Sequence, residues 1–309
     1  MPILVLKLLL TPILIGVPSL AGRRWGSAVA GWLIALPLTT GPTALYLSLD
    51  HGVAFGRSAI IASMAGNLAI GAFCFAYAHT CRRLPWYGAI GAGAVGFVAV
   101  SVASQPLLAG AFLGIEPATA ASAATGASGD VAVLTLGSAL LVGAFVWAGV
   151  AAAVLLMPPG GPRRVHSTPP KWDIPFRIVL GTAVILIITA IAPLVGPTAD
   201  GLIASFPIFS TILAVFTQLR EGVGQSIRLL RGLEVGLFGT AASQLTLWLA
   251  LGAMPLVPAF LLAAAVALAA GFATFRLLPR DAAAEAVDAD LPEADGAVVV
   301  VDAAESAHR

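Results

Sequence analysis

Charged residues are scarce in this sequence. Asp, Glu, Lys and Arg make up only 10% of its 309 residues, and hydrophobic residues make up 59%, whereas globular domains carry about 25% charged residues. The mean hydropathy is +0.98. This composition excludes a water-soluble globular domain and predicts an integral membrane protein.

Cysteine and histidine are also scarce. The two cysteines, Cys74 and Cys81, lie in one predicted helix and its end, too rigidly spaced to bridge each other, and they indicate neither a disulfide framework nor a metal site. No zinc-protease, P-loop or paired-carboxylate motif occurs. The sequence Gly-Ala-Ser-Gly around Ser128 matches the G-x-S-G of intramembrane serine proteases, which need a histidine on a later span. The later histidines, His166 and His308, lie outside the predicted spans. We predict no enzyme, no metal and no cofactor.

Long apolar runs are what the sequence has in plenty. A helix needs about 20 mainly apolar residues to cross a bilayer. Nine segments qualify: 3–20, 26–49, 53–79, 86–110, 131–157, 174–195, 198–219, 224–250 and 255–278. The first has no small-residue cleavage site after it, so we interpret it as a retained span and not as a signal peptide.

Basic residues indicate the orientation of these spans. If the N-terminus is outside, 13 basic residues fall at the cytoplasmic ends and two, Lys7 and Arg57, fall on the outer side. Lys and Arg are enriched in cytoplasmic loops, so we predict an outer N-terminus and a cytoplasmic C-terminus. Topology thus accounts for the basic residues, and we predict no nucleic-acid partner.

Three stretches are loops by composition. Residues 114–130 are small and polar and form a predicted outer loop, and residues 158–172 combine Pro, Gly and positive charge, as a cytoplasmic hinge would. Eight of the 15 acidic residues follow Arg280. We predict a solvated, disordered cytoplasmic tail over 281–309.

A pattern of Gly and Pro occurs twice, 170 positions apart. The residues of the first copy are Gly26, Gly31, Pro37, Gly52 and Gly66, and those of the second are Gly196, Gly201, Pro207, Gly222 and Gly236. Gly and Pro fix backbone geometry, so their coincidence predicts a duplicated fold.

The copies begin at the first and sixth predicted spans, an odd number of spans apart. They therefore enter the membrane from opposite sides. We predict an all-α polytopic membrane protein of about nine transmembrane helices, with two inverted four-helix repeats and a connecting helix. The predicted units are 1–113 for the first repeat, 114–173 for the outer loop, connecting helix and hinge, 174–280 for the second repeat, and 281–309 for the tail.

Pro37 and Pro207 lie midway along their predicted spans. A proline there removes a backbone donor and frees a carbonyl, so the helix kinks or unwinds, and backbone groups exposed at such breaks are ligands for a small polar or anionic solute. The acid deepest in the membrane is Glu234. The predicted substrate-binding residues are Pro37, Thr39, Thr40, Gly41, Pro42, Pro207, Ser210 and Glu234.

Charged residues near the span ends are the predicted gating or ion-pair residues. Lys7 and Arg177 occupy equivalent positions, as do the pairs Asp50-His51 and Arg220-Glu221. The alternative interpretations are snorkelling to headgroups for the first two and helix capping in water for the pairs. Arg228 and Arg231 lie on one face of a span with Glu234, and the spacing of Arg231 and Glu234 allows an ion pair.

A resemblance to a known family arises in the second copy. The run Asp-Gly-Leu-Ile-Ala-Ser-Phe-Pro-Ile-Phe-Ser over 200–210, preceded by a span beginning Phe176-Arg177, resembles the GlpM family of small bacterial inner-membrane proteins. It covers 174–278 more closely than 3–110, where Pro-Leu-Thr-Thr-Gly-Pro departs from the pattern. The resemblance implies a fused duplication of one such unit in the bacterial inner membrane. It implies no substrate.

Inverted repeats with interrupted helices are characteristic of secondary transporters. The sequence therefore predicts secondary transport of a small solute, with the lipid bilayer as its surroundings, and is compatible with a homo-oligomer. The alternative is a membrane protein that acts by binding, as an assembly or envelope-maintenance factor does. A close-packed midplane would favour the alternative.

Overall fold

The described part of the chain is helical. The computed structural model describes residues 2–37, 40–106, 136–160, 172–195, 206–251 and 253–277. These ranges contain helices, turns and one isolated bridge between Leu251 and Met254, so the predicted all-α class is confirmed. The predicted outer loop and tail lie outside the described residues. The described residues all belong to one compact unit, which extends to Leu278.

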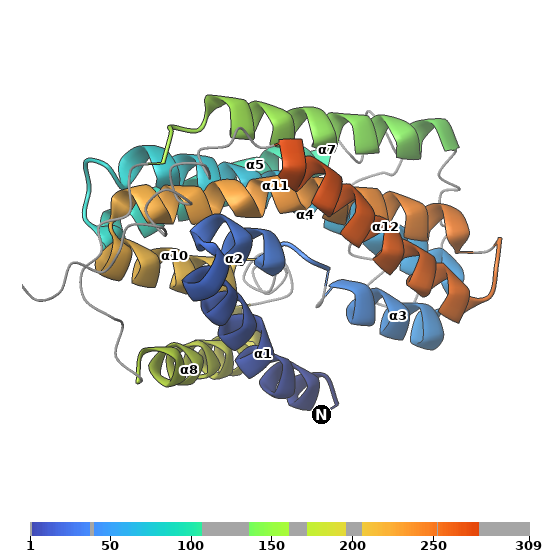
Figure 1. Ribbon diagram of the computed structural model, residues 1–309. Coiled ribbons are helices and arrows are strands. Elements are labelled where there is room, and N and C mark those ends of the chain that lie inside the picture. The colour runs from blue at the N-terminus through green and yellow to red at the C-terminus, as the bar shows by residue number, and fades with distance from the viewer. Residues whose placement is uncertain are drawn as a thin grey trace, which may run out of the picture. The chain divides into compact units, whose positions relative to one another are not determined.

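Ten helices are described within this unit (Figure 1). They are α1 Pro2–Trp25, α2 Ser27–Ile34, α3 Thr40–His51, α4 Val53–Thr80, α5 Trp86–Pro106, α7 Leu136–Leu156, α8 Asp173–Val195, α10 Ile208–Glu221, α11 Val223–Ala250 and α12 Leu256–Leu277. Four contain a stretch that is long and apolar enough to cross a membrane: Ala59–Thr80, Trp86–Ser104, Ala139–Leu156 and Leu256–Arg276.

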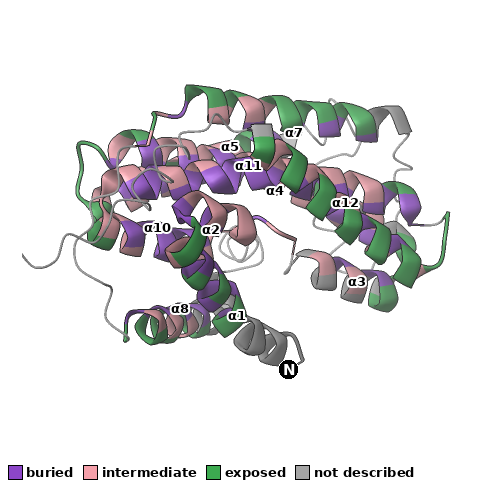
Figure 2. Ribbon diagram, viewed as in Figure 1, coloured by how far each residue is buried: buried purple, intermediate pink, exposed green. Residues whose placement is uncertain are grey.

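Exposed residues line the outward faces of α7 and α12 (Figure 2), and large apolar residues of α5, α7 and α12 are among the exposed ones. Val95 is 70% exposed, Leu155 is 80% exposed and Leu261 is 67% exposed. Soluble monomers rarely expose apolar surface on this scale. These faces suit lipid contact and support the predicted membrane class.

Glycine marks three helix boundaries. Gly26, Gly52 and Gly222 have φ values of 95°, 89° and 96°, a region that side chains with a Cβ rarely enter. Each precedes the first residue of a helix, namely α2, α4 and α11. Three members of the repeated Gly pattern thus turn the chain between helices.

α11 packs against α2, α4, α7, α10 and α12, and most of its side chains are buried. α2 lies very close to α11, because a Cβ on Gly31 would come 1.8 Å from the Leu229 carbonyl oxygen and one on Gly232 would come 2.0 Å from that of Ala28. The two helices therefore meet backbone to backbone through small residues, as in membrane helix packing.

The boundaries of several helices recur at the spacing of the Gly and Pro pattern. α4 and α11 each have 28 residues, Val53–Thr80 and Val223–Ala250, and lie 170 positions apart. α5 begins at Trp86 and α12 at Leu256, again 170 positions apart.

Candidate functional site

The predicted span over 26–49 is interrupted at Pro37. α2 ends at Ile34 and α3 begins at Thr40, so the helix break predicted around this proline is confirmed. The Gly41 amide donates to the Pro37 carbonyl (3.1 Å) and closes the first turn of α3. Thr39 and the side chains of Thr40 and Pro42 lie outside the described residues.

Pro207 occupies the equivalent place in the second half. It is the N-cap residue of α10, and residues 196–205 lie outside the described part. The hydroxyls of Ser210 and Thr211 donate to the Pro207 carbonyl at 2.9 Å and 2.8 Å. Ser210 thus donates to the backbone carbonyl of the proline itself. Its buried hydroxyl is already engaged in this state.

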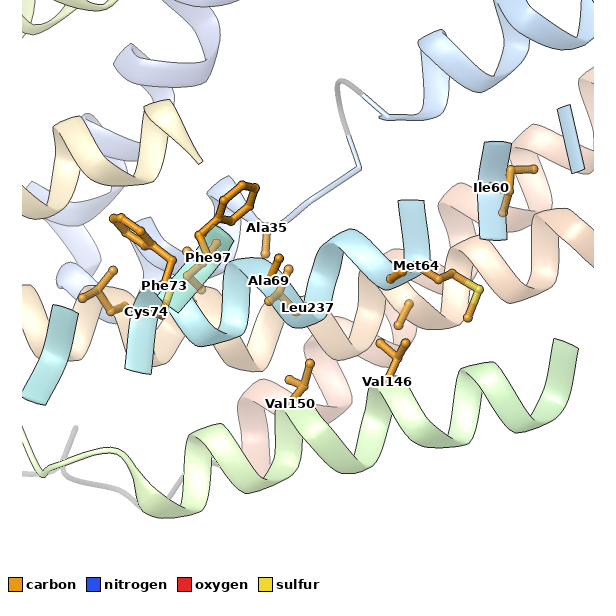
Figure 3. Packing of buried hydrophobic residues seen from close by; sticks show 14 of the residues in the cluster. Ala35, Ile60, Met64, Ala69, Phe73, Cys74, Phe97, Val146, Val150 and Leu237 are labelled. Atoms are coloured by element: carbon orange, nitrogen blue, oxygen red, sulfur yellow. The ribbon is translucent and has the colours of Figure 1, made fainter. Parts of the chain in front are cut away.

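The chain beside each proline packs on the long helix of the other half. The Ala35 carbonyl, at the end of α2, accepts a hydrogen bond from Thr240 of α11. Phe206, just before Pro207, packs edge-on against Phe73 of α4 and Phe97 of α5, with ring centroids 5.4 Å apart in both pairs. Figure 3 shows Ala35, Phe73, Phe97 and Leu237 in one cluster of buried side chains. α11 therefore contacts the chain beside Pro37, and α4 contacts the chain beside Pro207.

Glu234 lies at the crossing of α4 and α11. It is 0% exposed, and its carboxylate faces Gly71 of α4, where a Cβ would lie 3.3 Å and 3.4 Å from the two oxygens. Neither oxygen has a hydrogen-bond partner among the described residues. A carboxylate in such a place needs a proton, a cation or a donor.

The ion pair predicted between Arg231 and Glu234 is wrong. Arg231 donates instead to the Val154 carbonyl at the end of α7 (3.3 Å), whereas Glu234 faces α4. Helical spacing brings the two residues to one side of α11, but α4 and α7 both pack there and draw the side chains apart.

Polar side chains bridge helices around this crossing. Asn67 donates to Gln244 (2.8 Å), Tyr77 donates to Gln218 (2.7 Å), and Ser27 donates to Gln225 (2.7 Å). Gln218 and Gln244 thus form hydrogen bonds between helices, as polar side chains do within membrane helix bundles.

Removing one of these bonds should have a small effect. We expect Asn67→Leu to lower the free energy of unfolding by about 0.6 kcal/mol, the average for hydrogen bonds between membrane helices, because polar groups find other partners in the unfolded state within the membrane. Denaturant titration in micelles measures the change, with Asn67→Leu/Gln244→Leu as the control that leaves no orphaned amide. A loss of several kcal/mol would contradict this estimate.

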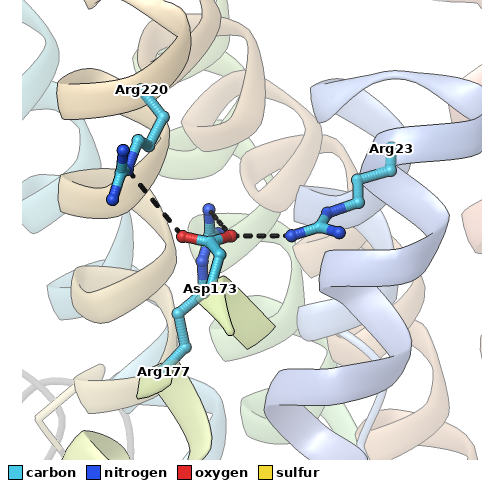
Figure 4. A network of polar contacts seen from close by, with 4 residues as sticks. All are labelled: Arg23, Asp173, Arg177 and Arg220. Carbon is cyan, nitrogen blue, oxygen red and sulfur yellow. Dashed lines mark hydrogen bonds and ion pairs between the residues drawn. The ribbon is translucent and has the colours of Figure 1, made fainter. Parts of the chain in front are cut away.

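A cluster of one aspartate and three arginines joins α1, α8 and α10 (Figure 4). Asp173 is 0% exposed. Its Oδ2 accepts from Arg23 (2.8 Å) and from Arg177 (2.9 Å), and its Oδ1 lies 4.0 Å from Arg220 Nε. We call these four residues the Asp173 cluster. It holds the end of α1, the start of α8 and the end of α10 together.

An aromatic ring lies beside each of two arginines of the Asp173 cluster. The Arg177 guanidinium lies 4.9 Å from the centroid of the Phe216 ring, and that of Arg220 lies 5.2 Å from the centroid of the Trp172 ring. Glu221 acts on Arg177 as a second negative charge. Cation–π contacts thus supplement the ion pairs.

The other predicted gating residues are dispersed. Asp50 is exposed near the end of α3, and the side chains of Lys7 and His51 lie outside the described residues. Arg228 covers Gly160 after α7, where a Cβ would lie 2.3 Å from Arg228 Cγ. Of the predicted gating set, the structure brings together Arg177, Arg220 and Glu221.

Sequence reasoning missed Asp173, Arg23, Gly71 and Thr240. The i,i+4 spacing of Asp173 and Arg177 at a helix start was an available signal. The contacts of Arg23 with Asp173, Gly71 with Glu234 and Thr240 with Ala35 span more than 140 positions, and no local pattern marks them.

No protein-family model, curated protein or solved structure matches this chain.

Proposed function

We propose that this protein is a secondary transporter of a small polar or anionic solute in a bacterial inner membrane. The observation that carries the proposal is that the chain beside each proline packs on the long helix of the other half. A solute site at these interruptions would be divided between two bodies. Rocking of one body against the other would then open it to alternate sides.

A duplicated fold is supported by backbone hydrogen bonds. Several of them in the first half have a counterpart 170 positions later with the same donor and acceptor atoms. The pairs are Gly41–Pro37 with Thr211–Pro207, Gly56–Gly52 with Ser226–Gly222, Cys81–Tyr77 with Leu251–Leu247, and Ala89–Pro85 with Ala259–Pro255. A fused duplication of a unit like the small GlpM-type proteins accounts for this coincidence.

The contacts between α4 and α11 support an inverted arrangement of the halves. Arg57 lies over the Trp248 ring, Asn67 bonds to Gln244, and Gly71 faces Glu234. As the residue number increases along α4, the number of the contacting residue on α11 decreases, so the two helices are antiparallel. Equivalent helices run antiparallel when a two-fold axis in the membrane plane relates the repeats.

α1 and α8 show the same relation. Arg23 bonds to Asp173, Gly16 lies beside Ile178, and Ile15 lies beside Gly181, so these helices are also antiparallel. Contacts between the halves are also reciprocal. α5 contacts α10, and their equivalents α12 and α3 contact each other. Both patterns fit a pseudo-two-fold axis, with α7 as the helix that connects the repeats.

The Asp173 cluster fits a closed gate on the cytoplasmic side. The positions 170 residues before Asp173, Arg177 and Arg220 are Ile3, Lys7 and Asp50. The outer side therefore has no counterpart of an aspartate among three arginines. We infer that the state described here is closed toward the cytoplasm by this cluster, and that this closed state accounts for the close packing around the buried Ser210 and Glu234.

Access to Ser210 from the two sides of the membrane tests the transport proposal. In a variant whose native cysteines are replaced by serine, Ser210→Cys should react with an impermeant maleimide in both right-side-out and inside-out vesicles, because alternating access exposes the interruption to each side in turn. Val95→Cys, on the exposed face of α5 and midway along that helix, is the matched lipid-facing control and should react from neither side. Reaction of Ser210→Cys from one side alone, or from neither, would contradict transport and favour a binding or assembly protein.

A further inference from the structure

The carboxyl of Glu234 is buried deep in the bundle and has no hydrogen-bond partner among the described residues. Glu234 is the twelfth residue of α11, about 17 Å along the helix at 1.5 Å per residue. It faces α4, the antiparallel equivalent of α11. Gly71 lacks a side chain where the carboxyl lies, so α4 leaves room for this group.

The described helices that pack on α11 bring no cation to Glu234. α2 and α7 carry no titratable side chain. On α4, Cys74 is the neighbour that interacts with Glu234, Arg57 lies over Trp248, Tyr77 bonds to Gln218 and His79 bonds to the Phe75 carbonyl. On α10, the titratable residues are Arg220 and Glu221, at the end of the helix. On α12, Arg276 lies beside Phe272. On α11 itself, Arg228 extends to Gly160 and Arg231 extends to Val154.

A charged carboxylate without a partner is costly in so dry a place, and protonation removes the charge. The crossing of α4 and α11 is also where the two halves meet. Any rocking of the halves changes this contact and admits water to the carboxyl.

We propose that Glu234 binds and releases a proton as α4 and α11 move against each other, so that H⁺ is the coupling ion of the transporter. The inference rests on the proposed function. In the closed arrangement the carboxylate has combined with one proton to form the neutral acid. When the crossing opens, the acid gives that proton to water, and no other reactant is required.

Infrared spectroscopy of the full-length protein in liposomes tests the proton site. Exposed carboxyls are ionised at neutral pH, so the wild type should show a protonated-carboxyl C=O band that Glu234→Gln lacks. Glu234→Met is the matched second variant. Met64 occupies the position 170 residues earlier and is 0% exposed, so the fold accepts this side chain at the equivalent place. A band that persists in both variants would overturn the proposal.

Coupling is tested with Ser210→Cys. The ratio of its labelling from the two sides, taken at one pH, cancels the pH dependence of the thiol. We expect this ratio to change severalfold across a pH series with Glu234 present and to stay constant in the Glu234→Gln and Glu234→Met backgrounds. A ratio independent of pH with Glu234 present would overturn proton coupling, yet labelling from both sides would leave transport standing. Labelling from one side alone would instead contradict transport.

Discussion

Gly31→Val will separate α2 from α11. A Cβ at Gly31 would lie 1.8 Å from the Leu229 carbonyl oxygen and 2.7 Å from the Leu233 nitrogen, and backbone atoms cannot rotate away. Overpacked cores lose about 1–3 kcal/mol where side chains can adjust. With rigid backbone as the obstacle, we expect a loss of at least about 3 kcal/mol of unfolding free energy, measured by denaturant titration in micelles with tryptophan fluorescence.

Gly91→Val is the matched control for this prediction. Gly91 is exposed on α5, and a Cβ there would meet nothing within 4 Å. The same side chain should change the unfolding free energy by no more than about 0.5 kcal/mol. If Gly31→Val yields too little folded protein, Gly31→Ala tests the same contact with one carbon. Equal stability of the Gly31 and Gly91 variants would show that α2 does not meet α11 backbone to backbone.

Asp173→Ala should be the most damaging removal of a charge. It leaves Arg23 and the buried Arg177 without the carboxylate that both contact. Breaking a buried pair by removing one partner costs about 3–5 kcal/mol. We expect a loss of that size in unfolding free energy, together with faster proteolysis at the ends of α1 and α10, which the carboxylate joins.

A double-mutant cycle separates this effect from a general loss of packing. In an Arg177→Met background, Asp173→Ala should cost clearly less, because the most buried arginine is no longer left unpaired. Asp50→Ala, at an exposed aspartate near the end of α3, should cost less than about 1 kcal/mol. An identical cost of Asp173→Ala in both backgrounds would show that the ion pair with Arg177 contributes nothing.

The sequence predicts those parts of the fold that depend on local backbone geometry. Gly52 and Gly222 belong to the repeated pattern and lie where the chain turns between helices, because positive φ favours glycine. Pro37 predicted a break because it cannot donate in a helix. Apolar runs predicted helices because hydropathy depends on consecutive residues and not on which helices pack together. These features are encoded within a few residues of where they act.

The parts that could not be predicted depend on which helices become neighbours. The spacing of Arg231 and Glu234 allows an ion pair on an isolated helix, but α7 offers Arg231 a carbonyl and α4 leaves space for Glu234 at Gly71. In the sequence, Asp173 is simply an acidic residue at the start of a predicted helix. It is the centre of a cluster because the fold brings it into contact with Arg23, which lies 150 positions earlier. The substrate cannot be inferred from the sequence, since Thr39, Thr40 and Ser210 suit many small polar solutes.

The hydrogen bond from Thr240 to the Ala35 carbonyl also has a consequence for biosynthesis. The two residues are 205 positions apart, and ribosomes add about 5–20 residues per second. The end of α2 therefore waits roughly 10–40 s for its partner after it leaves the ribosome. During that interval the interrupted helix needs water, lipid headgroups or an insertion chaperone to satisfy its open carbonyl. The nascent first half thus contains a helix end whose native hydrogen-bond donor has not yet been synthesised.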